Sequence, residues 1–268
     1  MKELRRRFAT IRESLRLTLT DTPLLRACNL NSGYGKKQVV FDLSFEVNKG
    51  EIVALIGPNG AGKTTLFNLL TGFLQTSAGK IFFKGKEITG FPPYKVSHLG
   101  ISRSFQITSI FPELSVCENI RIVLQSRTKA NYFFFSSMNG LRSLEEKAQE
   151  ILKRIGLEDK GNILAKNLSH GEKRILDIGI GLASNPELLL LDEPASGLVG
   201  DEIVRVTELV RSIASYITIV LVEHNIDVVL SISDTITVLY YGEVIAEGKP
   251  EEIQINAKVQ EIYLGDYQ

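Results

Sequence analysis

The sequence predicts an α/β fold built on a parallel sheet, with a helical segment inserted into it. After residue 187, short apolar runs of strand length alternate with helix-like segments, which is typical of strands joined by crossover helices. The nearly all-apolar run 51–56 leads into a glycine-rich loop and then a helical pattern, as expected of a central strand buried on both faces. Between these two groups, residues from about 107 to 170 have a mainly helical pattern.

Length and composition indicate an ordinary globular protein. The 268 residues suffice for one large or two small domains at about 150 residues each, and 44% are hydrophobic and 23% charged. Lys plus Arg and Asp plus Glu both number 31, and this zero net charge argues against nucleic acid as a partner. The two cysteines form no C-x-x-C pattern, which excludes a disulfide framework and a zinc site and suits a reducing cytosol.

No segment looks like a membrane anchor or a secretory signal. Every apolar run is shorter than the about 18 residues that a spanning helix needs, and the arginine-rich N-terminus has no apolar core after it. We therefore expect a soluble or peripheral protein.

Residues 1–22 differ from the rest and are expected to form a basic amphipathic extension. Basic residues outnumber acidic ones there, and Leu4, Phe8, Ile11 and Leu15 fall on one face of a helix. Such a helix could lie on an anionic membrane surface, or the segment could be a solvated or loosely docked extension; both interpretations stay open.

The first strands follow in chain order. Residues 43–47 alternate apolar and polar side chains, as a half-buried strand does. The buried strand 51–56 comes next, and residues 81–88 have the pattern of a hairpin around Gly85.

The remaining elements are assigned from periodicity. Helices are expected at 116–125, at 141–155 and from a start after Ser169. The aromatic run 131–135 inside this insertion could form a docking surface or fold onto its own core. The later strands and helices are expected at 187–191, 201–215, 216–222, 225–231 and 235–240.

A glycine-rich loop predicts a phosphate-binding site. It lies between the strand 51–56 and the next helix, and it fits the pattern G-x-x-x-x-G-K-[ST]. Its residues are Gly57, Pro58, Asn59, Gly60, Ala61, Gly62, Lys63 and Thr64, with Thr65 continuing into the helix. Glycines let the backbone wrap closely around phosphates, and the N–H groups of a helix start point at the anion. Lys63 can neutralise the β- and γ-phosphates of a nucleotide, and the Thr64 hydroxyl can bind Mg²⁺.

Two carboxylates end a later apolar strand. Asp192 and Glu193 follow residues 188–191, so both would lie at the carboxyl edge of the sheet, facing the phosphate loop. Asp192 suits Mg²⁺ coordination, directly or through water, and Glu193 suits activation of the water that attacks the γ-phosphate. Taken alone, the pair before Pro194 could also form a helix-capping turn.

The segment Leu168-Ser169-His170-Gly171-Glu172 resembles the signature sequence of ATP-binding cassette (ABC) ATPases, usually Leu-Ser-Gly-Gly-Gln. His170 and Glu172 depart from it, while Ser169 and Gly171 are kept. A Ser and a Gly at a helix start offer a hydroxyl and N–H groups to a phosphate. Ser169 and Glu172 also fit a simple capping box, and both interpretations can hold together.

The resemblance implies further roles. Gln106, after Phe105, would be the glutamine that contacts Mg²⁺ or the attacking water. His224 would be the switch histidine against the γ-phosphate, and Tyr34 would stack on adenine. Val199 stands where many members have an aspartate that links the two subunits, which leaves the role of this position open.

The resemblance also implies an architecture: a P-loop ABC-ATPase core with a parallel sheet, an antiparallel β subdomain and an inserted helical subdomain. We divide the chain into the extension 1–22, an ABC ATPase domain at 23–250 with the helical subdomain at about 107–170, and a helical tail at 251–268. ATP and Mg²⁺ are the implied cofactors.

Within the family, the resemblance is greatest to ATP-binding subunits of branched-chain (hydrophobic) amino-acid importers. It rests on residues 102–106, 111–116 and 168–172 and on the tail 242–248 and 263–265. Urea-import and lipopolysaccharide-export ATPases share part of this tail. Those two, a lipid exporter and a soluble assembly scaffold remain alternatives, whereas a plain P-loop kinase or GTPase needs neither the signature nor His224.

The implied partners follow from one phosphate loop and one signature per chain. In the family, each ATP lies between the phosphate loop of one subunit and the signature of the other, so a homodimer or a heterodimer with a second ABC ATPase is expected. Separate transmembrane permease subunits, and through them a periplasmic or surface substrate-binding protein, would complete the transporter. The chain would lie peripherally on the cytoplasmic face of the inner membrane.

Overall fold

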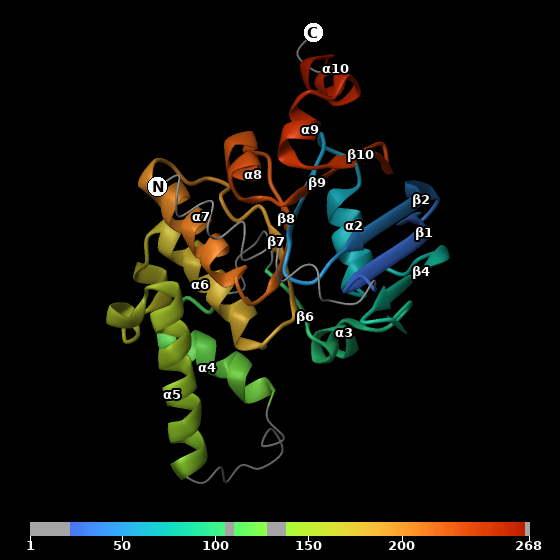
Figure 1. The fold of residues 1–268 in the computed structure, drawn as a ribbon. Coiled ribbons are helices and arrows are strands. Elements are labelled where there is room, and N and C mark those ends of the chain that lie inside the picture. The colour runs from blue at the N-terminus through green and yellow to red at the C-terminus, as the bar shows by residue number, and fades with distance from the viewer. Residues whose placement is uncertain (1–21, 105–109, 128–137, 266–268) are drawn as a thin grey trace.

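The structure, a computed structural model, describes residues 22–104, 110–127 and 138–265. Its central element is a six-stranded sheet with the order β10-β9-β3-β8-β7-β6 (Figure 1). The strands are β3 (Ile52–Ile56), β6 (Ile101–Arg103), β7 (Leu188–Asp192), β8 (Thr218–Val222), β9 (Thr235–Tyr240) and β10 (Glu243–Gly248). Neighbouring strands run parallel except for β10, which is antiparallel to β9. This confirms the predicted α/β fold with a parallel sheet.

A second, antiparallel sheet has the order β2-β1-β4-β5. Its strands are β1 (Leu25–Tyr34), β2 (Lys37–Val47), β4 (Ala78–Phe83) and β5 (Lys86–Glu87). β4 and β5 pair on either side of Gly85, as the sequence pattern indicates. α2 (Lys63–Leu70) belongs to the hydrophobic core that joins this sheet to the parallel one, because Phe67 packs in the same buried cluster as Phe45 and Leu55.

Helices between β6 and β7 form a group on the side of the molecule opposite the antiparallel sheet (Figure 1). They are α4 (Val116–Ser126), α5 (Met138–Ile155) and α6 (His170–Ala183), with short 3₁₀ turns at Glu158–Lys160 and Ala165–Asn167. Ile120, Leu152 and Ile178 place one residue from each of the three helices in a common buried cluster. Each of α4 and α6 begins with a reciprocal capping box, which satisfies amides at the helix start.

The other helices complete the layers around the sheet. They are α3 (Pro93–Leu99), α7 (Asp201–Ile213), α8 (Ile226–Ile232), α9 (Pro250–Gln254) and α10 (Ala257–Gly265). The observed helix ends differ by up to three residues from the predicted ones: α5 begins at Met138 rather than 141, and α7 ends at Ile213 rather than 215. The strand expected at 43–47 begins six residues earlier, at Lys37. None of the helices in the described ranges is both long and apolar enough to cross a bilayer.

Strand register sets the position of the site. Leu55 of β3 and Asp192 of β7 both pair with Val222 of β8, so three neighbouring parallel strands end at the same edge. The loops that follow these strands must therefore meet there. The predicted extension 1–22 (apart from Thr22), the aromatic run 131–135 and Gln106 lie outside the described residues.

Candidate active site

The loop after β3 needs glycine at its first position. Gly57 has a φ of 152°, and a Cβ built on it would lie 2.2 Å from the carbonyl oxygen of Leu239 in β9. Any side chain would therefore push the loop off the sheet edge. The loop ends at Gly62, whose left-handed conformation starts α2 with Lys63 as its first residue.

Lys63 closes the loop on itself. Its Nζ donates to the carbonyl oxygens of Gly57 at 2.6 Å and Pro58 at 3.0 Å. Burial lowers the pKa of this ammonium group, and the nearby charges of Glu193 and Asp192 partly oppose that shift. The structure thus brings the lysine of the phosphate loop and both carboxylates into one electrostatic environment.

The other residues of the predicted loop differ in exposure. Asn59, Gly60 and Thr64 face solvent, whereas Ala61 and Thr65 are buried. Thr64 therefore presents its hydroxyl at the open start of α2, and Thr65 packs in the core.

Asp192 and Glu193 have different surroundings at the end of β7. Asp192 is buried and accepts a hydrogen bond from Arg103 at 2.7 Å. Glu193 has a φ of 51°, a conformation that is uncommon for a residue with a side chain, and its N–H donates to the carbonyl oxygen of Val222 at 2.9 Å. This strained backbone turns the Glu193 carboxylate out of the strand and toward β8.

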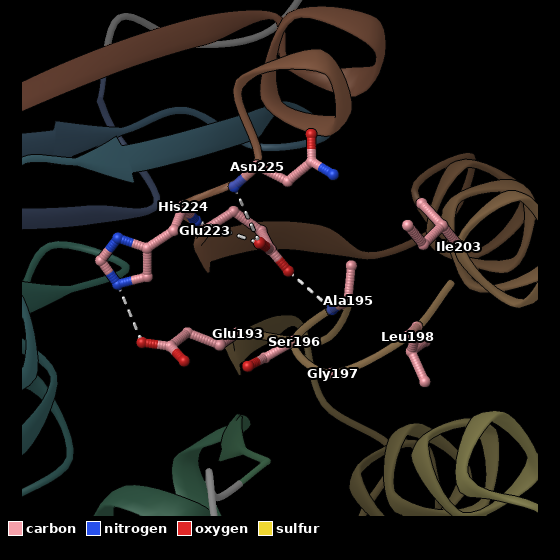
Figure 2. Close-up of a pocket in the computed structure, with 9 residues that line it drawn as sticks. All are labelled: Glu193, Ala195, Ser196, Gly197, Leu198, Ile203, Glu223, His224 and Asn225. Atoms are coloured by element: carbon pink, nitrogen blue, oxygen red, sulfur yellow. Dashed lines mark hydrogen bonds and ion pairs between the residues drawn. The ribbon is translucent and has the colours of Figure 1, made fainter. Parts of the chain in front are cut away.

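The Glu193 carboxylate meets His224 there. His224 Nε2 lies 3.0 Å from Glu193 Oε1 (Figure 2). The imidazole is 45% exposed and the carboxylate side chain 16%, so the pair lies at the surface of the sheet edge, where water can reach it.

The buried carboxylate of Glu223 connects the loop after β7 with the loop after β8. Its Oε1 accepts the Ala195 N–H at 2.6 Å, and its Oε2 accepts the N–H groups of His224 at 3.1 Å and Asn225 at 3.5 Å (Figure 2). Burial raises the pKa of this carboxyl, and the three N–H groups partly oppose the shift. These residues line a pocket of about 370 Å³ together with Glu193, Ser196, Gly197, Leu198 and Ile203.

The residues of the predicted signature lie at the start of α6. Ser169 caps the helix by accepting the N–H of Glu172 at 3.2 Å, so the capping-box interpretation describes the local structure. Gly171 N–H donates to Oε1 of Glu202, on α7, at 3.1 Å, and the Ser169 hydroxyl lies 3.5 Å from the same oxygen. The donors of this helix start therefore already hold a carboxylate.

Tyr34 ends β1 as a residue that is 51% exposed, and its hydroxyl accepts a hydrogen bond from Asn68 of α2 at 3.0 Å. An exposed aromatic residue in contact with the helix that follows the phosphate loop is compatible with stacking on a base.

Four residues of this region had no role assigned from the sequence: Asn68, Arg103, Glu202 and Glu223. Glu223 could have been noticed, because it immediately precedes His224 at the end of an apolar strand. The other three act through contacts between segments far apart in the chain, which no local pattern signals.

A glycine loop at a helix start, a histidine after the neighbouring strand and two carboxylates at the end of the strand beyond it define a nucleotide-hydrolysing P-loop protein. A profile of the ABC transporter family matches residues 40–196, and a profile described as branched-chain amino acid ATP-binding cassette transporter matches residues 243–267. The chain belongs to the ABC transporter family and is an ATP-binding subunit with ATPase activity. The resemblance inferred from the signature segment is thereby confirmed.

The similarity to known proteins covers nearly the whole chain. It is 38% identical to the high-affinity branched-chain amino acid transport ATP-binding protein LivG of Salmonella typhimurium, covering 91% of this chain and 98% of that protein. It is 35% identical to the corresponding protein BraF of Pseudomonas aeruginosa, with the same coverage. Among solved structures, an ATP-binding cassette of an ABC transporter in its ADP conformation has a TM-score of 0.81 at 31% identity, covering 91% of this chain and 99% of that one.

Proposed function

We propose that this chain, with Mg²⁺ bound, hydrolyses ATP to energise the import of branched-chain amino acids. The observation that carries the proposal is the 3.0 Å contact between Glu193 and His224, next to two groups of opposite charge, Lys63 and Asp192. The proposal is supported by the presence of a carboxylate, an imidazole and a cation at one sheet edge, which could act as base, phosphate sensor and phosphate ligand.

The phosphate loop supplies binding. Amides at the start of α2 would hold the β- and γ-phosphates, and the Lys63 ammonium would exchange one of its loop carbonyls for a phosphate oxygen. Tyr34 would stack its exposed ring on the adenine.

The residues present fit Mg²⁺. Thr64 offers an exposed hydroxyl and Asp192 a carboxylate close to Lys63, and hard oxygen donors with phosphate oxygens are the ligands that Mg²⁺ prefers. Gln106, which lies outside the described residues, is a third candidate. Bound there, the ion would neutralise charge on the phosphates.

Glu193 would take a proton from the attacking water as the general base. Its backbone strain and its contact with His224 restrict where the carboxylate can point. His224 would hold the γ-phosphate in place by a hydrogen bond and lose that partner when phosphate leaves.

The assembly would contain two ATP-binding subunits. Ser169 and Gly171 would bind the γ-phosphate of a partner's ATP, so that the nucleotide holds the pair together until hydrolysis. We place the pair on transmembrane permease subunits at the cytoplasmic face of the inner membrane, served by a substrate-binding protein. The relatives named for branched-chain amino acid transport, and the C-terminal profile of the same description, favour import over the scaffold, urea and lipid alternatives.

The hydrolytic role is tested with Glu193→Gln. This variant should retain nucleotide binding, lose hydrolysis by about 10²- to 10⁴-fold and accumulate ATP-bound dimers on size-exclusion chromatography. Glu187→Gln is the control, because Glu187 precedes the other end of the same strand, where it pairs with Lys84. Hydrolysis by Glu193→Gln at the wild-type rate would refute the assigned base.

The cargo is tested in cells that lack the gene. Uptake of radiolabelled leucine should be restored by the wild-type chain and not by Glu193→Gln. Restored uptake of urea, with leucine uptake unchanged, would overturn the assignment.

A further inference from the structure

A buried arginine contacts the predicted Mg²⁺ ligand. Arg103 ends β6, and its backbone pairs with Leu190 of β7, two residues before Asp192. The Arg103 guanidinium donates through NH2 to Asp192 Oδ2 at 2.7 Å. The two side chains are only 6% and 3% exposed, so this ion pair is shielded from water and salt.

The other end of the guanidinium is anchored on α2. Arg103 NH1 donates to Asn68 Oδ1 at 2.6 Å, and the guanidinium lies over the Phe67 ring, 5.4 Å from its centroid. The NH₂ group of Asn68 donates a hydrogen bond to the Tyr34 hydroxyl at 3.0 Å. One chain of hydrogen bonds therefore runs from Asp192 through Arg103 and Asn68 to Tyr34.

This series of hydrogen bonds joins the two regions that would contact opposite ends of the nucleotide. Asp192 lies near Lys63 of the phosphate loop, and Tyr34 offers its ring for the base. A buried ion pair often adds little net stability compared with apolar side chains of the same volume. The Arg103–Asp192 pair matters here for its geometry. A planar guanidinium held by an amide and an aromatic face can fix a carboxylate in one orientation.

We propose that Arg103 is a positioning residue that keeps Asp192 oriented for the metal–nucleotide complex, with Asn68 holding Arg103 in place. The bond uses one carboxylate oxygen, Oδ2, so the other oxygen would be the one to bind the metal or its bound water. This inference rests on the proposed function, in which Asp192 serves Mg²⁺. Partners of metal-binding side chains typically change metal affinity by about 10- to 100-fold when removed.

The test measures binding of mant-ADP, a fluorescent ADP analogue, as Mg²⁺ is added to protein first treated with EDTA. In Arg103→Met the Mg²⁺ concentration for half-maximal binding should rise by about tenfold or more, while mant-ADP affinity in EDTA stays within about twofold. Arg26→Met is the matched control, because Arg26 also lies over a phenylalanine ring, Phe82, at 5.3 Å, but on the antiparallel sheet.

Two further variants keep the test decisive if Arg103→Met fails to fold. Asn68→Leu leaves Arg103 in place but removes its anchor, together with the hydrogen bond to Tyr34, and should raise the Mg²⁺ requirement by a smaller factor, about threefold. Arg103→Lys keeps the charge, and its Mg²⁺ concentration for half-maximal binding should lie between those of the wild type and Arg103→Met. If folded Asn68→Leu and Arg103→Lys both show the wild-type Mg²⁺ dependence, the inference is overturned. If the wild-type protein itself binds mant-ADP without regard to Mg²⁺, the proposed function fails instead.

Discussion

Glu202 places its carboxylate on the amide of Gly171, 3.1 Å from the nitrogen, at the helix start that is proposed to receive a partner's γ-phosphate. A carboxylate and a phosphate are both anions that helix N-termini bind, so the two would compete for the same donors. Glu202 lies tightly against the backbone of the helix start, because a Cβ built on Gly171 would lie 2.9 Å from Glu202 Oε1. If a partner's γ-phosphate binds there as proposed, the Glu202 side chain has to move.

Glu202→Gln should make this pairing easier. Removing the charge weakens the competitor by about 0.3–1 kcal/mol, which corresponds to a roughly two- to fivefold lower ATP concentration for half-maximal dimer formation. The measurement is light scattering of the Glu193→Gln background as ATP is added. Asp201→Asn removes the neighbouring exposed acid of the same helix turn and should leave the midpoint unchanged. An unchanged midpoint in Glu202→Gln would show that the contact does not restrain assembly.

Glu223→Gln should slow hydrolysis, although Glu223 is not proposed to contact the nucleotide. The carboxylate accepts N–H groups on both oxygens, whereas glutamine has one acceptor oxygen and would turn an NH₂ group toward an N–H. We expect a loss of about 1–3 kcal/mol in the free energy of unfolding and a several-fold lower kcat, because His224 and Ala195 lose their common anchor.

Urea denaturation and steady-state ATPase assays separate the two effects of Glu223→Gln. Glu247→Gln is the control, since Glu247 accepts a hydroxyl hydrogen bond from Thr237 at 3.1 Å on β10, away from the strand ends. A control variant that lost as much kcat as Glu223→Gln would mean that reduced stability alone explains the effect.

Much of this fold could be predicted because its strands carry strong local signals. The runs 52–56 and 188–191 are apolar throughout, and the pairing of both with β8 is what a parallel sheet of buried strands requires. The position of Lys63 relative to Asp192 could be predicted for the same reason, since the carboxyl ends of the parallel strands of one sheet share an edge. β6, with only three residues, is too short to show any period.

The side-chain connections within the site could not be predicted. Arg103 reaches Asp192 across strands far apart in the chain, and Glu202 reaches Gly171 from a different helix. The capping box of Ser169 and Glu172 was visible as a four-residue pattern, but the occupation of the same helix start by Glu202 depends on how α6 packs against α7.

Glu172 should stabilise the start of α6 in a pH-dependent way. Burial alone would raise the pKa of Glu172. Hydrogen bonds from Lys160 and the Ser169 N–H lower the pKa by a larger amount, so the net shift is downward. A carboxyl with a lowered pKa contributes stability above its unfolded pKa of about 4.3, and this contribution is lost as the pH falls through the folded value.

Glu172→Gln isolates this charge, because glutamine also satisfies a capping box. At pH 7 the variant should lose about 1 kcal/mol, or roughly 2–4 °C in Tm, and the difference should shrink as the pH falls below about 4.3. Lys160→Met should cost a similar amount, and the double variant no more than either alone. A Tm difference that stays constant from pH 7 to pH 3.5 would contradict the ion-pair origin.

Cys117 should resist alkylation in the folded protein. Burial raises the pKa of this thiol to about 12, and the hydrogen bond that Sγ donates to Glu145 Oε1 at 3.2 Å raises it as well. At pH 8 only about one molecule in 10⁴ would carry the reactive thiolate, so iodoacetamide should modify the half-buried Cys28 first. Glu145→Gln removes one cause of the shift and should speed modification of Cys117, while unfolding in guanidinium should expose both thiols equally. Mass spectrometry of tryptic peptides follows each site, and labelling of Cys117 as fast as that of Cys28 in the native protein would contradict the buried, hydrogen-bonded thiol.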